Sequence, residues 1–153
     1  MHSAADLTRI LVQTDDFDLG QEYARLQQQP DCGAIVSFTG SVRELATAPL
    51  LSMTLEHYPG MTENALQQIV EQARSRWPLG KVTIIHRVGT LQVNEQIVLV
   101  LVSSAHRAAA FSACEFIMDF LKTRAPFWKK ETTAQGDHWV DAKASDAEAG
   151  QRW

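Results

Sequence analysis

The sequence predicts a mixed fold of the α/β or α+β class, in which three helices are interleaved with seven or eight strands. Two segments carry most of this prediction. Residues 62–77 place apolar side chains at helical spacing along one face, namely Leu66, Ile69, Val70, Ala73 and Trp77. Residues 97–102 form a continuous apolar run (IVLVLV), which is typical of a central strand. Alternation of the two kinds of segment along one chain favours a layered mixed architecture.

The N-terminal part of the chain predicts two strands and a short helix. Residues 8–13 indicate the first strand. Asp18 is expected to cap a short helix with Gln21 at the capping-box position, and its apolar face would consist of Leu19, Tyr23 and Leu26. Residues 33–42 are nearly continuously apolar, which predicts a strand covered on both faces. Residues 44–50 show no periodic pattern and are predicted to form a mobile loop.

The middle of the chain predicts two more strands around the 62–77 helix. Residues 51–58 alternate in polarity and indicate a strand with Leu51, Met53, Leu55 and His57 on one face. Thr62 is expected to be the N-cap of the helix that follows. Residues 81–88 predict the next strand, and residues 89–95 a turn or short hairpin.

The C-terminal part predicts the longest helix and a hairpin. Ser104 is expected to cap a helix over about residues 105–123, whose buried stripe would be Phe111, Cys114, Met118 and Leu121. Residues 127–132 and 138–140 indicate a hairpin around a turn at 135–137. The tail from about 145 to 153 is polar, and the whole chain, residues 1–153, is predicted to be one domain.

Composition excludes several classes of protein. A net charge of -4 disfavours general nucleic-acid binding, which requires an extended basic surface. No apolar run reaches the roughly 20 residues of a membrane span, and the first residues lack the apolar core of a signal peptide. The two cysteines follow no metal-ligand or redox spacing, and neither has a flanking cation or histidine that would make its thiol reactive. We therefore expect a soluble cytoplasmic protein with no metal site.

The most informative segment is a cluster of cations within residues 122–130, which consists of Lys122, Arg124, Lys129 and Lys130. Pro126 ends the preceding helix, so the two pairs of cations belong to different elements that can face each other across a corner. Phe127 and Trp128 lie between the pairs, which predicts a pocket for an anion. The alternative is a solvated surface in which helix-end cations merely offset the helix dipole.

Other cations end the predicted strands. His106 and Arg107 lie at the start of the longest helix, where free backbone amides favour an anion, although they are also consistent with a cap and a surface residue. Arg43 follows Gly40 at a strand end, and this pattern taken alone favours a solvated cation beside a bulge over a ligand-binding residue. Lys122 is the best candidate for chemistry, either as a neutral nucleophile or as an ammonium that stabilises an oxyanion.

Several segments resemble one family, the large, catalytic subunit of molybdopterin synthase. The matching stretches are FTGSVR, LEHYPGM, WPLG, SAHR and FIMDFLKTRAPFWKKE, which begin at Phe38, Leu55, Trp77, Ser104 and Phe116. The resemblance implies an α/β hammerhead fold with an additional small antiparallel β subdomain. It also implies the reaction: sulfur passes from the C-terminal glycine thiocarboxylate of a small ubiquitin-like partner to cyclic pyranopterin monophosphate (precursor Z), forming the dithiolene of molybdopterin. A homodimer at the centre of a heterotetramer is implied as well, with no cofactor.

The resemblance also assigns roles to individual residues. The implied catalytic residues are Lys122 and Lys129. The implied substrate-binding residues are Ser41, Val42, Arg43, His106, Arg107, Lys122, Lys129, Lys130 and Glu131. Ser41 stands where many relatives have lysine, and Lys143 where arginine is common. Two other functions compete with this one: a non-catalytic module that binds a phosphorylated metabolite or a ubiquitin-like tail, and a single-stranded nucleic-acid binder, which the net charge disfavours.

Overall fold

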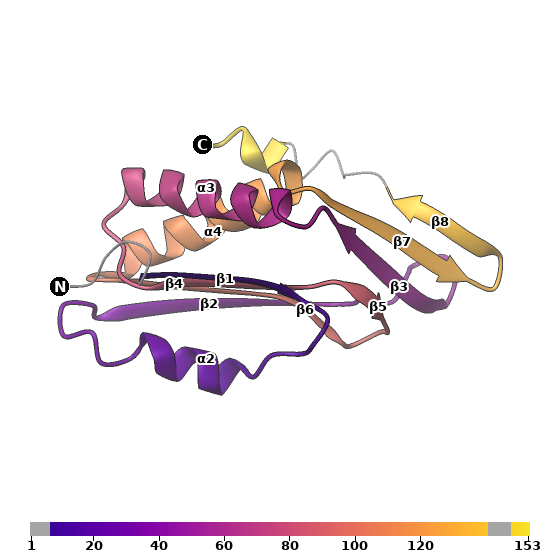
Figure 1. The fold of residues 1–153 in the computed structure, drawn as a ribbon, viewed down its shortest axis with the longest axis horizontal. Helices are drawn as coiled ribbons and strands as arrows, with labels where there is room; N and C mark the ends of the chain where they lie inside the picture. The colour runs from indigo at the N-terminus through magenta and orange to yellow at the C-terminus, as the bar shows by residue number, and fades with distance from the viewer. Residues whose placement is uncertain (1–6, 141–147) are drawn as a thin grey trace.

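The computed structural model describes residues 7–140 and 148–153, which fold into two four-stranded sheets and three main helices. The first sheet has the strand order β1-β4-β6-β2 and the second has the order β5-β3-β7-β8. Figure 1 shows the second sheet extending from one end of the first. The predicted mixed α/β class is confirmed, and the second sheet is the antiparallel β subdomain that the resemblance implied.

The first sheet is mixed. It contains β1 (Thr8–Gln13), β4 (Val82–Arg87), β6 (Gln96–Ser104) and β2 (Ala34–Ser41). Strands β1 and β4 run parallel, whereas β6 is antiparallel to both β4 and β2. The strand β6 is buried along most of its length, which confirms its prediction as a central strand.

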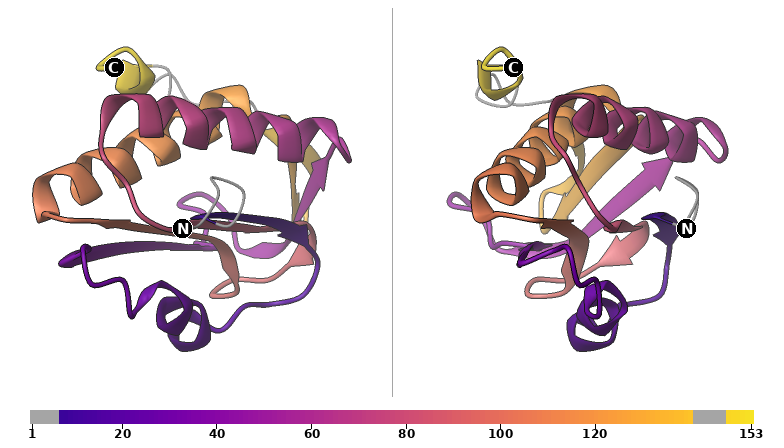
Figure 2. Two further views of the ribbon diagram at one scale, coloured as in Figure 1. Left: turned by 60° about the vertical axis from the view of Figure 1, so that its left-hand side comes forward. Right: turned by 90° about the vertical axis from the view of Figure 1, so that its left-hand side faces the viewer.

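Helices cover both faces of the first sheet. Figures 1 and 2 show α3 (Met61–Arg76) and α4 (Arg107–Arg124) on one face and α2 (Leu19–Leu26) on the other. The predicted apolar face of α3 is confirmed: Leu66, Ile69, Val70 and Ala73 are buried in the cluster that α3 and α4 form with the sheet, and Trp77, the C-cap residue, packs against it half-buried. A smaller cluster fills the space beneath α2 and includes Phe17, Leu26 and Ile85. Removal of these apolar side chains from water is the main force that holds the layers together.

The second sheet is antiparallel throughout. It contains β5 (Gly89–Leu91), β3 (Leu50–His57), β7 (Phe127–Thr133) and β8 (Gly136–Val140). One face of β3 buries Met53 and Leu55 against Val42 and Leu91 in a third apolar cluster. This cluster connects the second sheet to the chain that leaves β2, and therefore fixes both near the C-terminal end of α4.

Some details of the predicted strands and faces are wrong. The strand β2 was predicted to be covered, but it lies at an edge of its sheet and is half exposed. It pairs with β6 along one edge, and no strand among the described residues pairs with its other edge. Leu51 is exposed, because a register shift between Leu50 and Ser52 turns it away from the core. On α2 the buried pair is Glu22 and Leu26, whereas Leu19 and Tyr23 are exposed; Arg9 of β1 pairs with the Glu22 carboxylate and so draws it inward.

Two predicted helix caps are also wrong. Gly60, with a φ of 85°, is the N-cap of α3, and Glu63 closes the capping box on its backbone N–H. Thr62 is instead buried in the first turn. Ser104 remains in β6, where its hydroxyl donates to the Pro78 carbonyl, and α4 begins two residues later at the His106 cap. Phe111 faces solvent, because the buried stripe of α4 follows Ala110, Ala113, Cys114, Phe116, Ile117, Phe120 and Leu121.

The last residues of the chain pack back onto the helices. Trp153 contacts Trp77 and Phe116 edge to face, and its indole N–H donates to Asp119 at 2.6 Å. Arg152 forms ion pairs with Glu115 and Asp119 of α4. The predicted polar tail is therefore only partly solvated. Lys143 and residues 145–147 lie outside the described residues.

Candidate functional site

The two predicted catalytic lysines lie on either side of a helix–strand corner. Lys122 is in the last turn of α4, which ends at Arg124, and Lys129 is the third residue of β7. The corner between them, residues 125–126, is fixed to α3, because the buried Thr62 hydroxyl donates to the Pro126 carbonyl at 3.0 Å. Two cations from different elements are thus held at one junction, as the sequence predicted.

His86 lies beneath this corner. Its imidazole stacks on Phe127 with ring centroids 3.8 Å apart and planes 17° from parallel. Burial, helped by the positive charge of Lys122, lowers the pKa of His86 to about 4. The ring nitrogen Nδ1 lies 2.8 Å from the Arg87 carbonyl oxygen, which can only accept, so Nδ1 carries a proton. Because the pKa is lowered, the ring is neutral at pH 7. The sequence indicated only that His86 packs within a strand; its partner, Phe127, is 41 residues away in sequence.

Strand alternation divides the cations of β7 between two faces. Lys129 and Glu131 share the face of Phe127, because side chains two residues apart in a strand point the same way. Lys130 points to the opposite face, where its ammonium lies 3.9 Å from the Asp137 carboxylate and 5.6 Å from the centre of the Trp139 ring. The structure therefore places Lys129 and Glu131 on the face of β7 that carries Phe127, and Lys130 on the other face.

The end of β2 approaches the same region. Ser41 is the last residue of β2, after a register shift at Gly40, and Val42 is buried in the apolar cluster with Met53 and Leu55. In the second sheet Lys129 lies opposite Leu55, and Glu131 lies opposite Met53. Arg43, which follows Val42, is exposed. It therefore follows directly a residue that packs against β3, the strand that pairs with β7.

His106 and Arg107 lie at the other end of α4. The helix runs antiparallel to β6, so its first residues sit beyond Ser104 while its last turn lies near the start of β6. Arg107 and Lys122 are 15 residues apart on one helix (122 − 107), which corresponds to about 22 Å along its axis. One copy of the chain therefore does not bring His106 and Arg107 to the ligand that Lys122 would contact.

Neither thiol of the chain is suited to carry sulfur. Burial raises the pKa of Cys114 to about 12, and it also raises the pKa of Cys32. Both therefore remain protonated at neutral pH, and both are free thiols. This confirms the expectation that neither cysteine is reactive. Neither cysteine therefore offers a thiolate at neutral pH.

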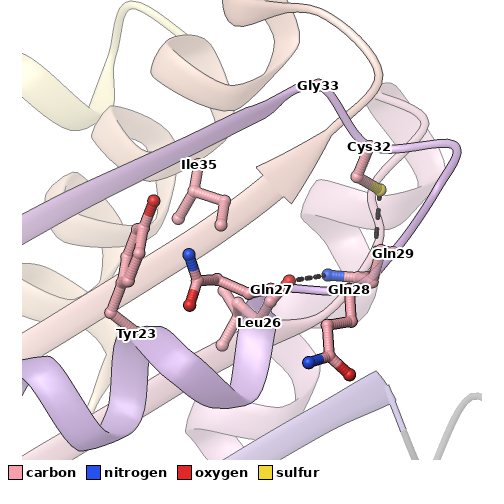
Figure 3. Close-up of a pocket in the computed structure, with 8 residues that line it drawn as sticks. All are labelled: Tyr23, Leu26, Gln27, Gln28, Gln29, Cys32, Gly33 and Ile35. Carbon is pink, nitrogen blue, oxygen red and sulfur yellow. Dashed lines mark hydrogen bonds between the residues drawn. The ribbon is translucent and has the colours of Figure 1, made fainter.

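A pocket of about 260 Å³ lies on the α2 side of the molecule, remote from the lysine corner. Figure 3 shows it between the end of α2 and the start of β2, with Tyr23, Cys32 and three glutamines on its walls. No cation lines it, and the Gln29 amide is occupied by bonds to the Leu26 carbonyl and the Ser103 hydroxyl. This pocket is therefore not the predicted anion site.

Two further searches cover residues 7–140 and 148–153. No group of three or more histidine, cysteine, aspartate or glutamate side chains in that part of the chain is arranged to hold a metal ion. None of the helices described there is both long and apolar enough to cross a membrane.

The fold and the corner together define a class: a two-sheet α/β protein in which a helix and a strand place lysines on either side of one corner. Comparison with known proteins identifies the family. The model of the MoaE protein family matches residues 12–124, and the chain belongs to this family. The chain is 54% identical to the molybdopterin synthase catalytic subunit of Escherichia coli strain K12, over 95% of this chain and 98% of that protein.

Solved structures agree with this assignment. The molybdopterin biosynthesis MoaE protein of Burkholderia ambifaria superposes with a TM-score of 0.83 at 52% identity, over 95% of this chain and 97% of the other. The molybdopterin synthase structure from Staphylococcus aureus gives a TM-score of 0.79 at 34% identity, over 87% and 96% of the two chains.

Proposed function

We propose that this chain is the catalytic subunit of a molybdopterin synthase. It would transfer sulfur from the C-terminal thiocarboxylate of a small ubiquitin-like partner to cyclic pyranopterin monophosphate, and so form the dithiolene of molybdopterin. The observation that carries this proposal is the pair Lys122 and Lys129 at one corner of a chain whose own thiols stay protonated. Such a site attracts anions but cannot donate sulfur. Both cysteines are free, which also supports a location in the reducing cytoplasm.

The chemistry explains why lysines are needed. The substrate phosphate and the partner thiocarboxylate both bring negative charge. The thiocarboxylate sulfur would attack a side-chain carbon of the pterin and so form a thioester between the two molecules. Water would then add to the thioester carbonyl, which places charge on its oxygen, and the acyl C–S bond would break to leave sulfur on the pterin and a carboxylate on the partner. A fixed ammonium next to that charge stabilises it more than water does, because the ammonium is already oriented. Lys122 would take this role at the end of α4, or act as the nucleophile in its amine form, and Lys129 would assist from β7.

The position of His106 and Arg107 supports a dimeric enzyme. These two residues are about 22 Å from Lys122 along α4, so in one chain they cannot bind the same small substrate. In a symmetric homodimer the first turn of α4 of one copy can reach the lysine corner of the other. We propose that each active site takes Lys122, Lys129 and Arg43 from one copy and His106 and Arg107 from its partner.

Reconstitution tests the reaction. This protein, a thiocarboxylated small partner and cyclic pyranopterin monophosphate are mixed, and the pterin product is followed by mass spectrometry. The wild type should add two sulfurs, whereas Lys122→Ala should lose on the order of 10²-fold or more in turnover. Lys81→Ala is the matched control, because this lysine lies on the α2 side and donates to the Arg25 carbonyl. Tight binding of both ligands without sulfur transfer by the wild type would instead establish the non-catalytic module.

Two further sets of variants test the geometry of the site. Lys129→Ala and Lys130→Ala remove adjacent lysines that point to opposite faces of β7, and only Lys129→Ala should strongly lower turnover.

Separately, Lys122→Ala and Arg107→Ala proteins are mixed under conditions that allow subunit exchange. If the sites are shared, about a quarter of wild-type activity should return. Random exchange makes half of the dimers mixed, and each mixed dimer has one intact site out of two. A mixture as inactive as its components would refute the shared site.

A further inference from the structure

His86 is a polar side chain on an apolar face of the first sheet. In β4 the side chains that face α3 and α4 are Val82, Ile84 and His86, and the first two belong to the main apolar cluster. The neighbours of His86 in adjacent strands are Val12 of β1 and Val98 of β6, which pack into the same cluster. A histidine with 5% of its surface exposed therefore occupies a position where the pattern calls for an aliphatic residue.

The groups around His86 come from four elements. Phe127 of β7 covers the ring, and the carbonyl of Arg87 accepts its Nδ1 proton. Lys122 of α4 and His57 of β3 both act on it electrostatically, and His57 is the cross-strand partner of Phe127. All of these contacts lie at the junction between the two sheets. His86 is thus the point where the first sheet meets the corner that carries the lysines.

We propose that His86 is a positioning residue of the sulfur-transfer site: its buried imidazole, stacked on Phe127, holds the start of β7 against the first sheet and so fixes Lys129 relative to Lys122. The inference rests on the proposed function for its activity readout, but its structural part stands without it. Phe127 and Lys129 are two residues apart on one strand, so a shift of the Phe127 ring carries Lys129 with it.

The ring chemistry fits this role. A flat, neutral ring can lie face to face on Phe127, whereas an imidazolium there would be a second cation beside Lys122 in a buried position. An aliphatic residue would complete the apolar row but would leave Phe127 without a planar partner. His86 therefore combines a flat contact surface with a hydrogen bond that fixes the orientation of the ring.

Two substitutions separate stacking from bulk. His86→Phe keeps a flat ring of similar size, and His86→Val matches the neighbouring valines but removes the ring. We expect His86→Val to lower kcat on the order of 10- to 100-fold, the range expected for a misplaced catalytic group, with KM changed by less than about threefold. His86→Phe should restore most of kcat. Placing each change in the Lys129→Ala protein completes a double-mutant cycle, in which His86→Val should have little further effect.

Amide hydrogen exchange provides a readout that does not depend on activity. His86→Val should raise exchange in the 125–130 segment while α3 and β6 remain protected, and His86→Phe should not. A His86→Val protein that loses global stability but keeps wild-type kcat and segment protection would refute the proposal. So would a His86→Phe protein as impaired as His86→Val, since the imidazole itself would then be required. If the wild type transfers no sulfur, the proposed function fails, and hydrogen exchange still decides the role of His86.

Discussion

Lowering the pH from 7 to 5 should destabilise this protein more than it destabilises the His86→Phe variant. The folded protein holds His86 neutral, because burial lowers its pKa from 6.5 to about 4. In the unfolded chain the same imidazole takes up a proton near its ordinary pKa. Between these two pKa values the unfolded state binds more protons, so stability falls as the pH falls. The contribution of His86 is fully present above pH 6.5 and is lost progressively toward pH 4.

The size of the effect follows from the two pKa values. A difference of this size corresponds to roughly 3 kcal/mol when both states have titrated, and the part lost between pH 7 and pH 5 is about 2 kcal/mol. This is a large fraction of the stability of an ordinary domain. The ion pairs of carboxylates should contribute little in this range, because most carboxyl groups titrate below it.

Urea denaturation at pH 5, 6 and 7, followed by tryptophan fluorescence at one protein concentration, measures this effect. A change in stability that the His86→Phe substitution causes equally at every pH cancels in this comparison, because the test is the difference in slope against pH between the two proteins. The wild type should lose about 2 kcal/mol more than the variant between pH 7 and pH 5. Equal slopes would refute the reasoning, because they would mean that His86 titrates normally in the folded protein.

Three further outcomes are expected. Gly80→Ala should destabilise by about 1–3 kcal/mol in urea denaturation, because a Cβ there would lie 2.6 Å from the Cys32 sulfur and 2.7 Å from the Ser103 hydroxyl; a neutral effect would show that this junction can relax. Trp153→Ala should cost about 2 kcal/mol in the same assay, against Trp139→Ala on the exposed β8 as control, and equal losses would contradict the packing of the chain end. Iodoacetamide at pH 7.5 should label Cys114 only after unfolding, and should label Cys32 slowly in the native protein. Mass spectrometry measures the label at each cysteine, and rapid labelling of Cys114 in the native protein would contradict its raised pKa.

Sequence patterns located the helices and strands well where residues close together in the sequence determine the structure. The first strand begins and ends where predicted, and Asp18 caps α2 through the Gln21 backbone N–H. The apolar face of α3 is also as predicted. These features depend on residues within one or two helical turns of each other, so the local sequence contains the information.

The errors have a common cause. The sequence of β2 is apolar enough for a buried strand, but its exposure depends on sheet order, which places it at an edge. Similarly, the exposure of Leu51 depends on a register shift against β7, and the burial of Glu22 depends on Arg9 in another element. None of these partners is visible in the local pattern.

The sequence by itself determined the cations and the proline that separates them, since residue identity fixes charge and backbone geometry. Only the tertiary structure decided how these groups are distributed in space. Strand alternation separates Lys129 from Lys130, the length of α4 separates Arg107 from Lys122, and long-range stacking places His86 under Phe127. Such relations arise when segments distant in the chain pack together, because packing selects one arrangement of side chains from the many that a local pattern allows.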